Sequence, residues 1–259
     1  AARVSVGGKK VCEIRETIRK LPTGPAETVW VEKPGRLFLN GKPVFFLGWY
    51  NDFWLVSQPH REKYADSRAR TPQANMRSWV SIEPNRLSPN LEEREAVHDM
   101  MPSEEVLKKL AEVVAEAKSR RFHFYYLADE PAYRNISPVY LRHIYEKVKE
   151  LDPYHPVMIV DVNPDKYIDC ADVINMHPYF GPTLNEKGER VISGGLESAM
   201  NCFDAYHRAA EGKNGKAVMM MPQAFTYRYM NIYGEFPTFD EMHANMFSGV
   251  ARGAQGLQP

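Results

Sequence analysis

Two adjacent carboxylates follow an apolar and aromatic run in the middle of the chain. The run His123–Ala128 has the composition of a buried strand, and Asp129, Glu130 and Pro131 come directly after it. A carboxyl group at the edge of a partly dry pocket holds its proton to higher pH, so it can act as a general acid near neutral pH. Pro131 favours an extended backbone at Glu130. The same residues also suit solvated acids at the end of a strand or at a helix N-terminus.

Further side chains with binding chemistry follow other apolar runs. Aromatic rings stack on apolar ligand faces, and imidazole and amide groups form hydrogen bonds with hydroxyl groups. Core packing is the alternative use of these aromatic residues, and a buried histidine is as often structural as functional. The candidates for substrate binding are Trp49, Tyr50, Asn51, His177, Tyr179 and Gln223.

The strands and helices that must position these residues alternate along most of the chain. Asn40-Gly41 predicts a tight hairpin turn between two strand-like runs, the second of which is apolar enough to be buried on both faces. Further strands are predicted at 28–31, 73–82, 123–128, 156–160, 171–176 and 217–221. Helices are predicted at 103–118, 137–151, 196–211 and 238–252, with Ser103, Ser137 and Thr238 as N-caps.

The alternation predicts a parallel sheet with crossover helices, which closes either as an open doubly wound sheet or as a (β/α)8 TIM barrel. An open sheet usually carries a glycine-rich phosphate loop after its first strand, and the sequence has none. Polar and aromatic residues instead follow several different strands, which is typical of a barrel mouth. We therefore expect an α/β fold of the TIM-barrel class. It would be incomplete, because the strand that begins near Gly253 would have no partner in a chain ending at Pro259.

Composition narrows the function classes. The 33 basic and 33 acidic residues balance, which argues against a nucleic-acid partner. No apolar run approaches the ~20 residues of a membrane span. The 14 Tyr, 12 Phe and 4 Trp residues exclude a disordered chain. Three distant cysteines and scattered histidines give no metal-ligand spacing, so we expect neither a metal nor another cofactor.

Several segments together resemble the glycoside hydrolase clan with TIM-barrel catalytic domains that contains β-galactosidase and β-glucuronidase. RLFLNGKPVFFLGWYN resembles the segment that leads from a β-sandwich into the first barrel strand, and YYLADEPAY resembles the fourth strand. LDPYHPVMIV, ADVINMHPY and AVMMMPQAF are similar to strands five to seven, and PTFDEMHANMFSGVARGAQGL is similar to the last helix and the approach to the eighth strand. The likeness covers about residues 28–258 and is weakest at 52–102.

The resemblance implies roles for three residues. Glu130 matches the clan's general acid/base, and Asp129 stands where the clan usually has an Asn that contacts the sugar. Gln223 stands at the position of the clan's nucleophilic Glu at the end of strand seven. An amide cannot form the covalent glycosyl-enzyme of retaining hydrolysis.

Three interpretations of Gln223 stay open. A different carboxylate could serve, such as Asp52, Asp161 or Glu235; the enzyme could invert; or hydrolysis could be lost and the scaffold kept. The first hypothesis is therefore a glycoside hydrolase acting on O-glycosidic bonds of an oligo- or polysaccharide. The second is a catalytically inactive domain that binds carbohydrate or serves in an extracellular assembly. The resemblance also predicts a β-sandwich remnant or linker at 1–34, a barrel at 35–259, and a location outside the cell or in the secretory pathway.

Overall fold

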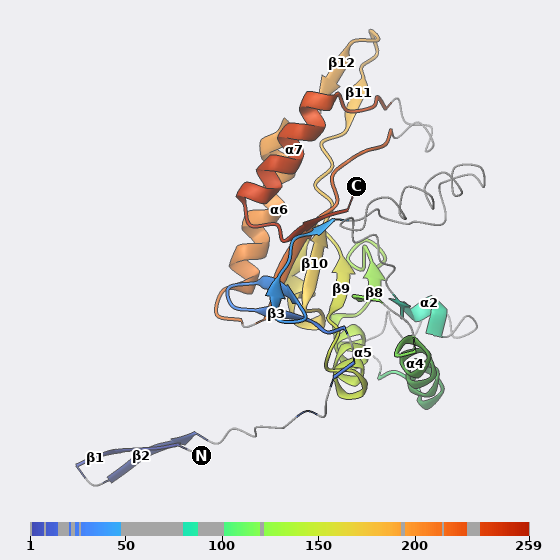
Figure 1. Cartoon of the computed structure of the whole chain (residues 1–259). Helices are drawn as coiled ribbons and strands as arrows, with labels where there is room; N and C mark the ends of the chain where they lie inside the picture. The colour runs from blue at the N-terminus through green and yellow to red at the C-terminus, as the bar shows by residue number, and fades with distance from the viewer. Residues whose placement is uncertain are drawn as a thin grey trace.

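A computed structural model describes residues 2–7, 9–14, 21, 24–25, 27–47, 80–87, 101–119, 122–192, 195–213, 215–226 and 234–258. Its elements run from an N-terminal hairpin through an alternating α/β region (Figure 1). In chain order they are β1 (Ala2–Val6), β2 (Lys9–Ile14), β3 (Val29–Glu32), β4 (Arg36–Leu39), β5 (Lys42–Pro43), β6 (Phe46–Leu47), β7 (Val80–Ser81), α2 (Pro84–Leu87), α4 (Glu104–Ala117), β8 (Tyr125–Asp129), α5 (Pro138–Leu151), β9 (Val157–Val160), η1 (Pro164–Lys166), η2 (Ile168–Cys170), β10 (Val173–Met176), β11 (Pro182–Leu184), β12 (Arg190–Ile192), α6 (Gly195–Ala210), β13 (Ala217–Met220), α7 (Phe239–Ala251) and β14 (Gly256–Leu257).

The central sheet has seven strands in the order β6-β14-β13-β10-β9-β8-β7, and every pairing in it is parallel. From β14 to β7 the order follows the chain in reverse, and the first strand, β6, pairs with the last, β14. Such a pairing of first and last strands is how a barrel with strands in chain order closes. The remaining neighbours, β6 and β7, are connected by residues 48–79, which lie outside the described residues. The α/β, TIM-like class predicted from the sequence is confirmed.

Two expectations about strands in this sheet were wrong. The last strand is not unpaired, because Leu257 pairs with both Met220 and Leu47. The run after Asn40-Gly41 is not buried on both faces, because Phe46 is buried but Leu47 is 47% exposed. Alternation in the sequence gives no information about which parallel strand lies next to which, since partners are distant in the chain.

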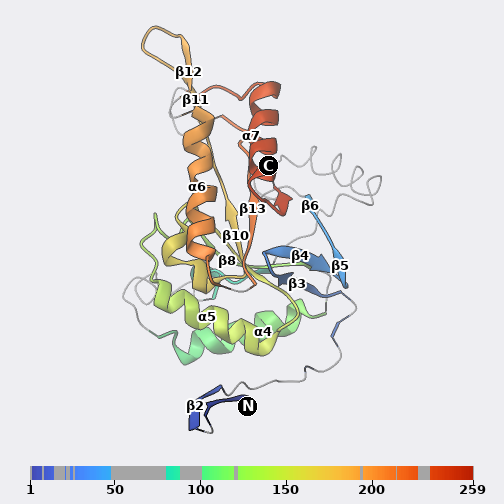
Figure 2. The same ribbon diagram turned by 90° about the vertical axis from the view of Figure 1, so that its left-hand side faces the viewer.

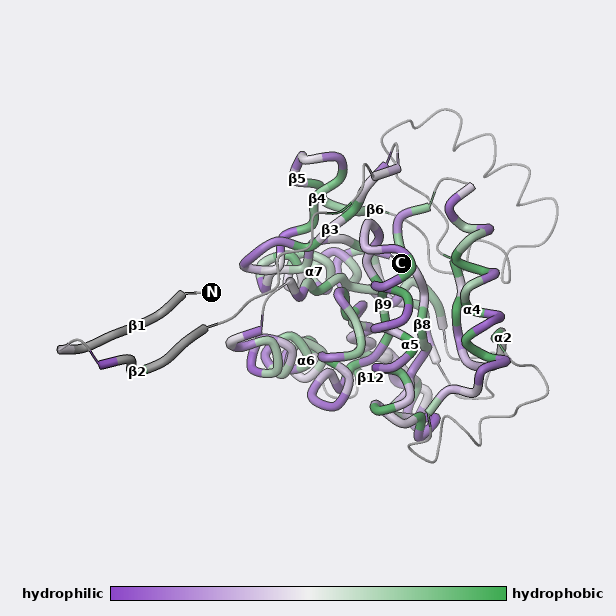
Figure 3. Tube along the Cα trace, turned by 90° about the horizontal axis from the view of Figure 1, so that it is seen from below, coloured by the Kyte–Doolittle hydropathy of each residue, from purple (hydrophilic) through white to green (hydrophobic). Residues whose placement is uncertain are grey.

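Helices cover one face of the sheet. Helices α6 and α7 run side by side, and α4 packs on α5 (Figure 2). Ser103 and Ser137 accept backbone hydrogen bonds at the starts of α4 and α5, and Thr238 forms a capping box with Glu241 on α7. Hydrophobic and hydrophilic residues alternate along α4 in Figure 3, as an amphipathic helix requires. The predicted helices and caps are confirmed.

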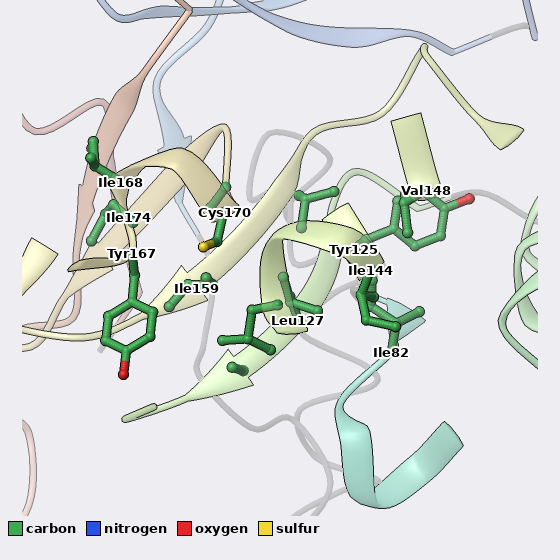
Figure 4. Packing of buried hydrophobic residues seen from close by; sticks show 14 of the residues in the cluster. Ile82, Tyr125, Leu127, Ile144, Val148, Ile159, Tyr167, Ile168, Cys170 and Ile174 are labelled. Atoms are coloured by element: carbon green, nitrogen blue, oxygen red, sulfur yellow. The ribbon is translucent and has the colours of Figure 1, made fainter. Parts of the chain in front are cut away.

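The larger hydrophobic cluster fills the space between the sheet and these helices (Figure 4). Tyr125, Leu127 and Ile159 point into it from the strands, while Ile144 contributes from α5. The smaller cluster lies on the other face of the sheet and contains Phe46, Tyr126, Met158, Val160, Val173 and Met219. Side chains therefore alternate between the two clusters along β9, in keeping with the two-residue period of a strand.

The three-stranded sheet β3-β4-β5 lies at the edge of the central sheet where the parallel strands begin. Val29 donates a hydrogen bond to the Tyr154 carbonyl, just before β9. Gly35, at φ +107°, lies so close to Lys216 that an added Cβ would be 2.4 Å from its carbonyl oxygen. Asn40 and Gly41 have φ values of 51° and 81°, so the predicted hairpin turn is confirmed. This packing leaves the opposite edge, where the strands end, for a site.

The predicted neighbouring β-sandwich is not seen in the described part of residues 1–34. Strands β1 and β2 pair only with each other, and Figure 1 shows their hairpin apart from the rest of the chain. Strand β3 pairs with β4, on the other side of the predicted boundary at residue 34.

A buried polar network joins β8 to the loop before β9. Asp152 Oδ2 accepts hydrogen bonds from the Tyr125 hydroxyl (2.8 Å) and from Nδ1 of His155 (2.9 Å). Asp152 Oδ1 accepts a third bond from the Tyr154 N–H. Burial acts to raise the pKa of Asp152, but the bonds and charge of His155 and the bond from Tyr125 outweigh it, so this pKa lies below its usual value.

Candidate functional site

An irregularity in β8 turns the Asp129 side chain toward the face of the sheet that lies away from the helices, called the inner face below. Tyr126 pairs with Met158, but the next pairs are Ala128 with Ile159 and Asp129 with Val160, so one residue of β8 is extra. Met158 and Val160 belong to the smaller cluster, on the face of the sheet away from the helices. Asp129 therefore has the orientation of Tyr126, which a regular strand would not give to a residue three positions later. The bulge therefore changes the direction of the Asp129 side chain at the end of this strand.

Glu130 has a left-handed backbone, with φ of 43°. This differs from the extended conformation predicted from Pro131, because the Glu130 N–H donates to the Val160 carbonyl (2.9 Å) and the chain then turns. A non-glycine residue in this region costs about 1–2 kcal/mol. The Glu130 side chain is 45% exposed, so the turn presents its carboxylate at the edge of the sheet.

Asp161 holds the turn that follows Glu130. It is 2% exposed, and its two carboxylate oxygens accept hydrogen bonds from the backbone N–H groups of Ala132 (3.1 Å) and Asn163 (2.8 Å). These bonds link the loop after β8 to the loop after β9. The geometry gives Asp161 a positioning task, although the sequence suggested it as a second reacting carboxylate.

His177 faces Glu130 from the end of β10. Its Nε2 atom lies 3.5 Å from Glu130 Oε1, and its side chain is 9% exposed. The Nε2 atom is buried and has no hydrogen-bond partner among the described residues. The His177 ring is tilted against Tyr179, with 5.0 Å between ring centroids. The structure thus brings three of the predicted site residues together.

Tyr179 connects this group to the end of β13. Its hydroxyl donates to the sulfur of Met221 (3.0 Å), and its ring packs edge-on against Phe225. Gln223, in the same loop, is fully buried. Its Oε1 accepts a hydrogen bond from the Gly181 N–H (2.9 Å), and its Nε2 donates to the Phe225 carbonyl (3.1 Å). The bond to Gly181 therefore ties the loop after β13 to the loop after β10, while the bond to Phe225 fixes the loop after β13 internally.

Arg134 and Glu83 belong to the same edge and were missed from the sequence. Arg134 Nη2 lies 3.4 Å from Asp129 Oδ2, and Nη1 lies 3.9 Å from Glu83 Oε1. Glu83 Oε2 also accepts a hydrogen bond from Ser81 at the end of β7. The guanidinium group therefore links Asp129, at the end of β8, to Glu83, which follows β7. Only the position of Glu83 after an expected strand could have indicated this contact.

The remaining predicted site residues and features are placed as follows. Trp49, Tyr50 and Asn51 lie outside the described residues, as does Asp52. Glu235 lies before α7, where its N–H donates to the Pro182 carbonyl.

Among the described residues, no three or more His, Cys, Asp or Glu side chains are grouped as metal ligands would be. The described helices include none that combines the length and apolarity of a membrane span.

Sequence comparisons do not place this chain in a family. No family model matches it, and no curated protein matches it.

Solved structures do match, and they are glycoside hydrolases. A GH2 β-galacturonidase from Eisenbergiella tayi superposes with a TM-score of 0.54 at 11% identity, over 90% of this chain and 46% of that one. A putative β-galactosidase from Bacteroides fragilis gives 0.54 at 13% identity, over 99% and 41%. A β-D-glucuronidase from Dictyoglomus thermophilum gives 0.53 at 17% identity, over 90% and 46%.

The chain thus shares the α/β, TIM-like fold of these solved structures, as the sequence resemblance implied. It spans less than half the length of these three proteins. With identities of 11–17%, it stands as a divergent relative in fold.

Proposed function

We propose that this chain is the catalytic domain of a glycoside hydrolase that cleaves O-glycosidic bonds of an oligo- or polysaccharide, with Glu130 as general acid/base. The observation that carries the proposal is the placement of Glu130. Its half-exposed carboxylate is held in a left-handed backbone conformation at the strand end, facing the buried imidazole of His177. Backbone strain of this kind is retained mainly at functional sites.

In the proposed reaction the Glu130 carboxyl group protonates the glycosidic oxygen as the bond to the anomeric carbon breaks. The electron pair of that bond stays on the leaving oxygen, and water supplies the hydroxyl group of the new sugar end. The remaining proton of this water restores the Glu130 carboxyl group, directly or through solvent. Asp129, held by Arg134, is a hydrogen-bond acceptor for a sugar hydroxyl, and Tyr179 offers an aromatic face. Trp49, Tyr50 and Asn51 complete the proposed binding residues.

Gln223 has no chemical step in this proposal, because an amide does not form a glycosyl ester. Water then attacks the anomeric carbon directly, or a carboxylate outside the described residues, such as Asp52, acts as nucleophile. Proton NMR of the first product formed distinguishes the two, since direct attack inverts the anomeric configuration and double displacement retains it.

The test is hydrolysis of aryl β-galactosides, β-glucuronides and β-galacturonides, a panel that follows the activities named for the structural relatives. Glu130→Gln should reduce kcat/KM by about 10²–10⁴-fold for poor leaving groups. The loss should be smaller for dinitrophenyl glycosides, whose leaving group needs no proton. Glu150→Gln, an exposed change on α5, is the matched control. Equal turnover by Glu130→Gln and wild type for a poor leaving group would contradict the assignment.

A second candidate is a catalytically silent domain that binds carbohydrate, alone or in an extracellular assembly. The buried amide of Gln223, with a hydrogen bond at each end, stands at the expected nucleophile position and favours it. In that case the panel shows no turnover, while calorimetry detects glycan binding that Tyr179→Ala weakens.

Two wider features belong to the same proposal. We propose that the chain acts outside the cell or in the secretory pathway, where polysaccharides are encountered, and that residues 1–34 adjoin a β-sandwich. Fractionation of the producing cells with an antibody against the barrel tests the location, and a cytoplasmic signal would contradict it.

A further inference from the structure

We propose that His177 is the positioning residue of Glu130, and that its Nε2–H captures the carboxylate once Glu130 has released its proton. The inference rests on the proposed function, because it assigns the group that handles Glu130 between the protonated and ionised states. It gives Glu130 an imidazole partner that comes from the end of β10.

The first observation is the unused donor position on a buried ring. His177 is 8% exposed overall, and its Nε2 atom is shielded from solvent without a hydrogen bond to any described residue. A buried polar atom left without a partner destabilises the folded state. Such an atom needs a partner that is present in some other state of the site.

The second observation is that Glu130 Oε1 is the charged atom placed to be this partner. The separation of 3.5 Å exceeds the 2.7–2.9 Å expected of a charge-assisted hydrogen bond by less than 1 Å. His177 is fixed by burial and by its contact with Tyr179, whereas Glu130 is 45% exposed and has three side-chain torsions. A small rotation of Glu130 therefore closes the contact.

The other charged and titratable groups that the structure describes at this edge are engaged elsewhere. Asp129 and Glu83 face Arg134, and both oxygens of Asp161 accept backbone N–H bonds. The Tyr179 hydroxyl donates to Met221, and Gln223 is an uncharged amide. His177 and Glu130 are thus the pair whose interaction changes when Glu130 ionises.

The proton balance is simple. When Glu130 protonates the leaving oxygen, it becomes a carboxylate that accepts the Nε2–H of His177, and no proton leaves the ring. When Glu130 later takes a proton from water, the hydrogen bond opens. The proposal requires the ring proton on Nε2, which nitrogen NMR of His177 reports directly. A neutral ring protonated only on Nδ1 would overturn it.

The test is a double-mutant cycle on stability, which needs no turnover. His177→Leu removes the donor, Glu130→Ala removes the acceptor, and urea unfolding is measured for both single variants and the double variant. We expect a coupling of about tenfold in the unfolding equilibrium constant, or about 1.4 kcal/mol.

Two further variants keep the result interpretable. His177→Gln places an amide N–H near the position of Nε2 and should keep part of the coupling, even if His177→Leu folds poorly. His207→Leu is the matched control, because His207 bonds to the Arg252 carbonyl at the end of α7. The effects of His207→Leu and Glu130→Ala on the free energy of unfolding should be additive. Additivity of both His177 variants with Glu130→Ala would overturn the inference.

Kinetics separate this inference from the proposed function. Where the chain hydrolyses glycosides, His177→Leu should lower kcat by about 10²-fold with KM little changed, and His177→Gln should recover part of it. A raised KM with unchanged kcat would mean that Nε2 binds substrate instead, and would overturn the positioning role. A chain that shows the stability coupling but no hydrolysis refutes the proposed function and leaves the pairing intact.

Discussion

Replacing Glu130 with glycine should stabilise the protein relative to replacing it with alanine. Both changes remove the carboxylate and its contact with His177, so their difference reports the backbone alone. At φ of 43°, alanine retains strain of about 1–2 kcal/mol that glycine does not have. Glycine loses about 0.4–1 kcal/mol of this advantage, because its unfolded chain is more flexible. The net expectation is that Glu130→Gly is about 0.5–1 kcal/mol more stable than Glu130→Ala.

The measurement is urea and thermal unfolding of the two variants side by side. For a chain of this size the difference corresponds to about 1–4 °C in Tm. The control pair is Glu112→Gly and Glu112→Ala in α4, where the backbone is helical and glycine should be the less stable by about 1 kcal/mol. A Glu130→Gly variant that is no more stable than Glu130→Ala would refute the argument that strain is held at this residue.

Three other outcomes follow from the geometry. Gln223→Glu should not create hydrolysis, and it should destabilise the fold by about 2–3 kcal/mol, since a carboxylate cannot donate to the Phe225 carbonyl; denaturant titration and the aryl glycoside panel check both. The pKa of Asp152 is lowered in the folded protein, so the stability that its carboxylate contributes is complete above the unfolded pKa of about 4 and is lost as pH falls through the native pKa. Asp152→Asn should lower the free energy of unfolding by about 2–3 kcal/mol at pH 7. In this variant the free energy of unfolding should also fall less steeply at acid pH. Burial raises the pKa of Cys170 and Cys202 to about 12, so in a Cys12→Ser background neither thiol should react with a disulfide reagent at pH 8 until urea unfolds the chain.

Features determined by neighbouring residues could be predicted from the sequence. Ser103 and Thr238 cap helices because their hydroxyl groups bond to N–H groups three residues along. Asn40 and Gly41 form their turn because both tolerate positive φ. Alternating strands and helices predicted the parallel sheet, and polar and aromatic residues after several strands, with no glycine-rich phosphate loop, predicted its TIM-like class.

Features that depend on distant contacts could not be predicted in the same way. The bulge in β8 exists only relative to β9, and it decides that Asp129 points inward. Asp161 looked like a free carboxylate in the sequence, but its acceptors are used by backbone groups of two loops. The pairing of β14 with β6 joins residues more than 200 positions apart. No local pattern encodes these contacts, although they set the geometry of the candidate site.

Gln223 and Glu130, at opposite ends of the candidate site, bear on different aspects of catalysis. Gln223 is compatible with a structural amide, because a residue that only bridges two loops gains stability from satisfying both of its polar ends. Glu130 has the opposite character, since its left-handed backbone costs stability that a glycine would not cost. A scaffold that had lost its chemistry would have no reason to hold a half-exposed carboxylate in a strained turn. The strain at Glu130 therefore weighs toward chemistry at this residue, and the amide at Gln223 weighs only against one form of it, the covalent intermediate.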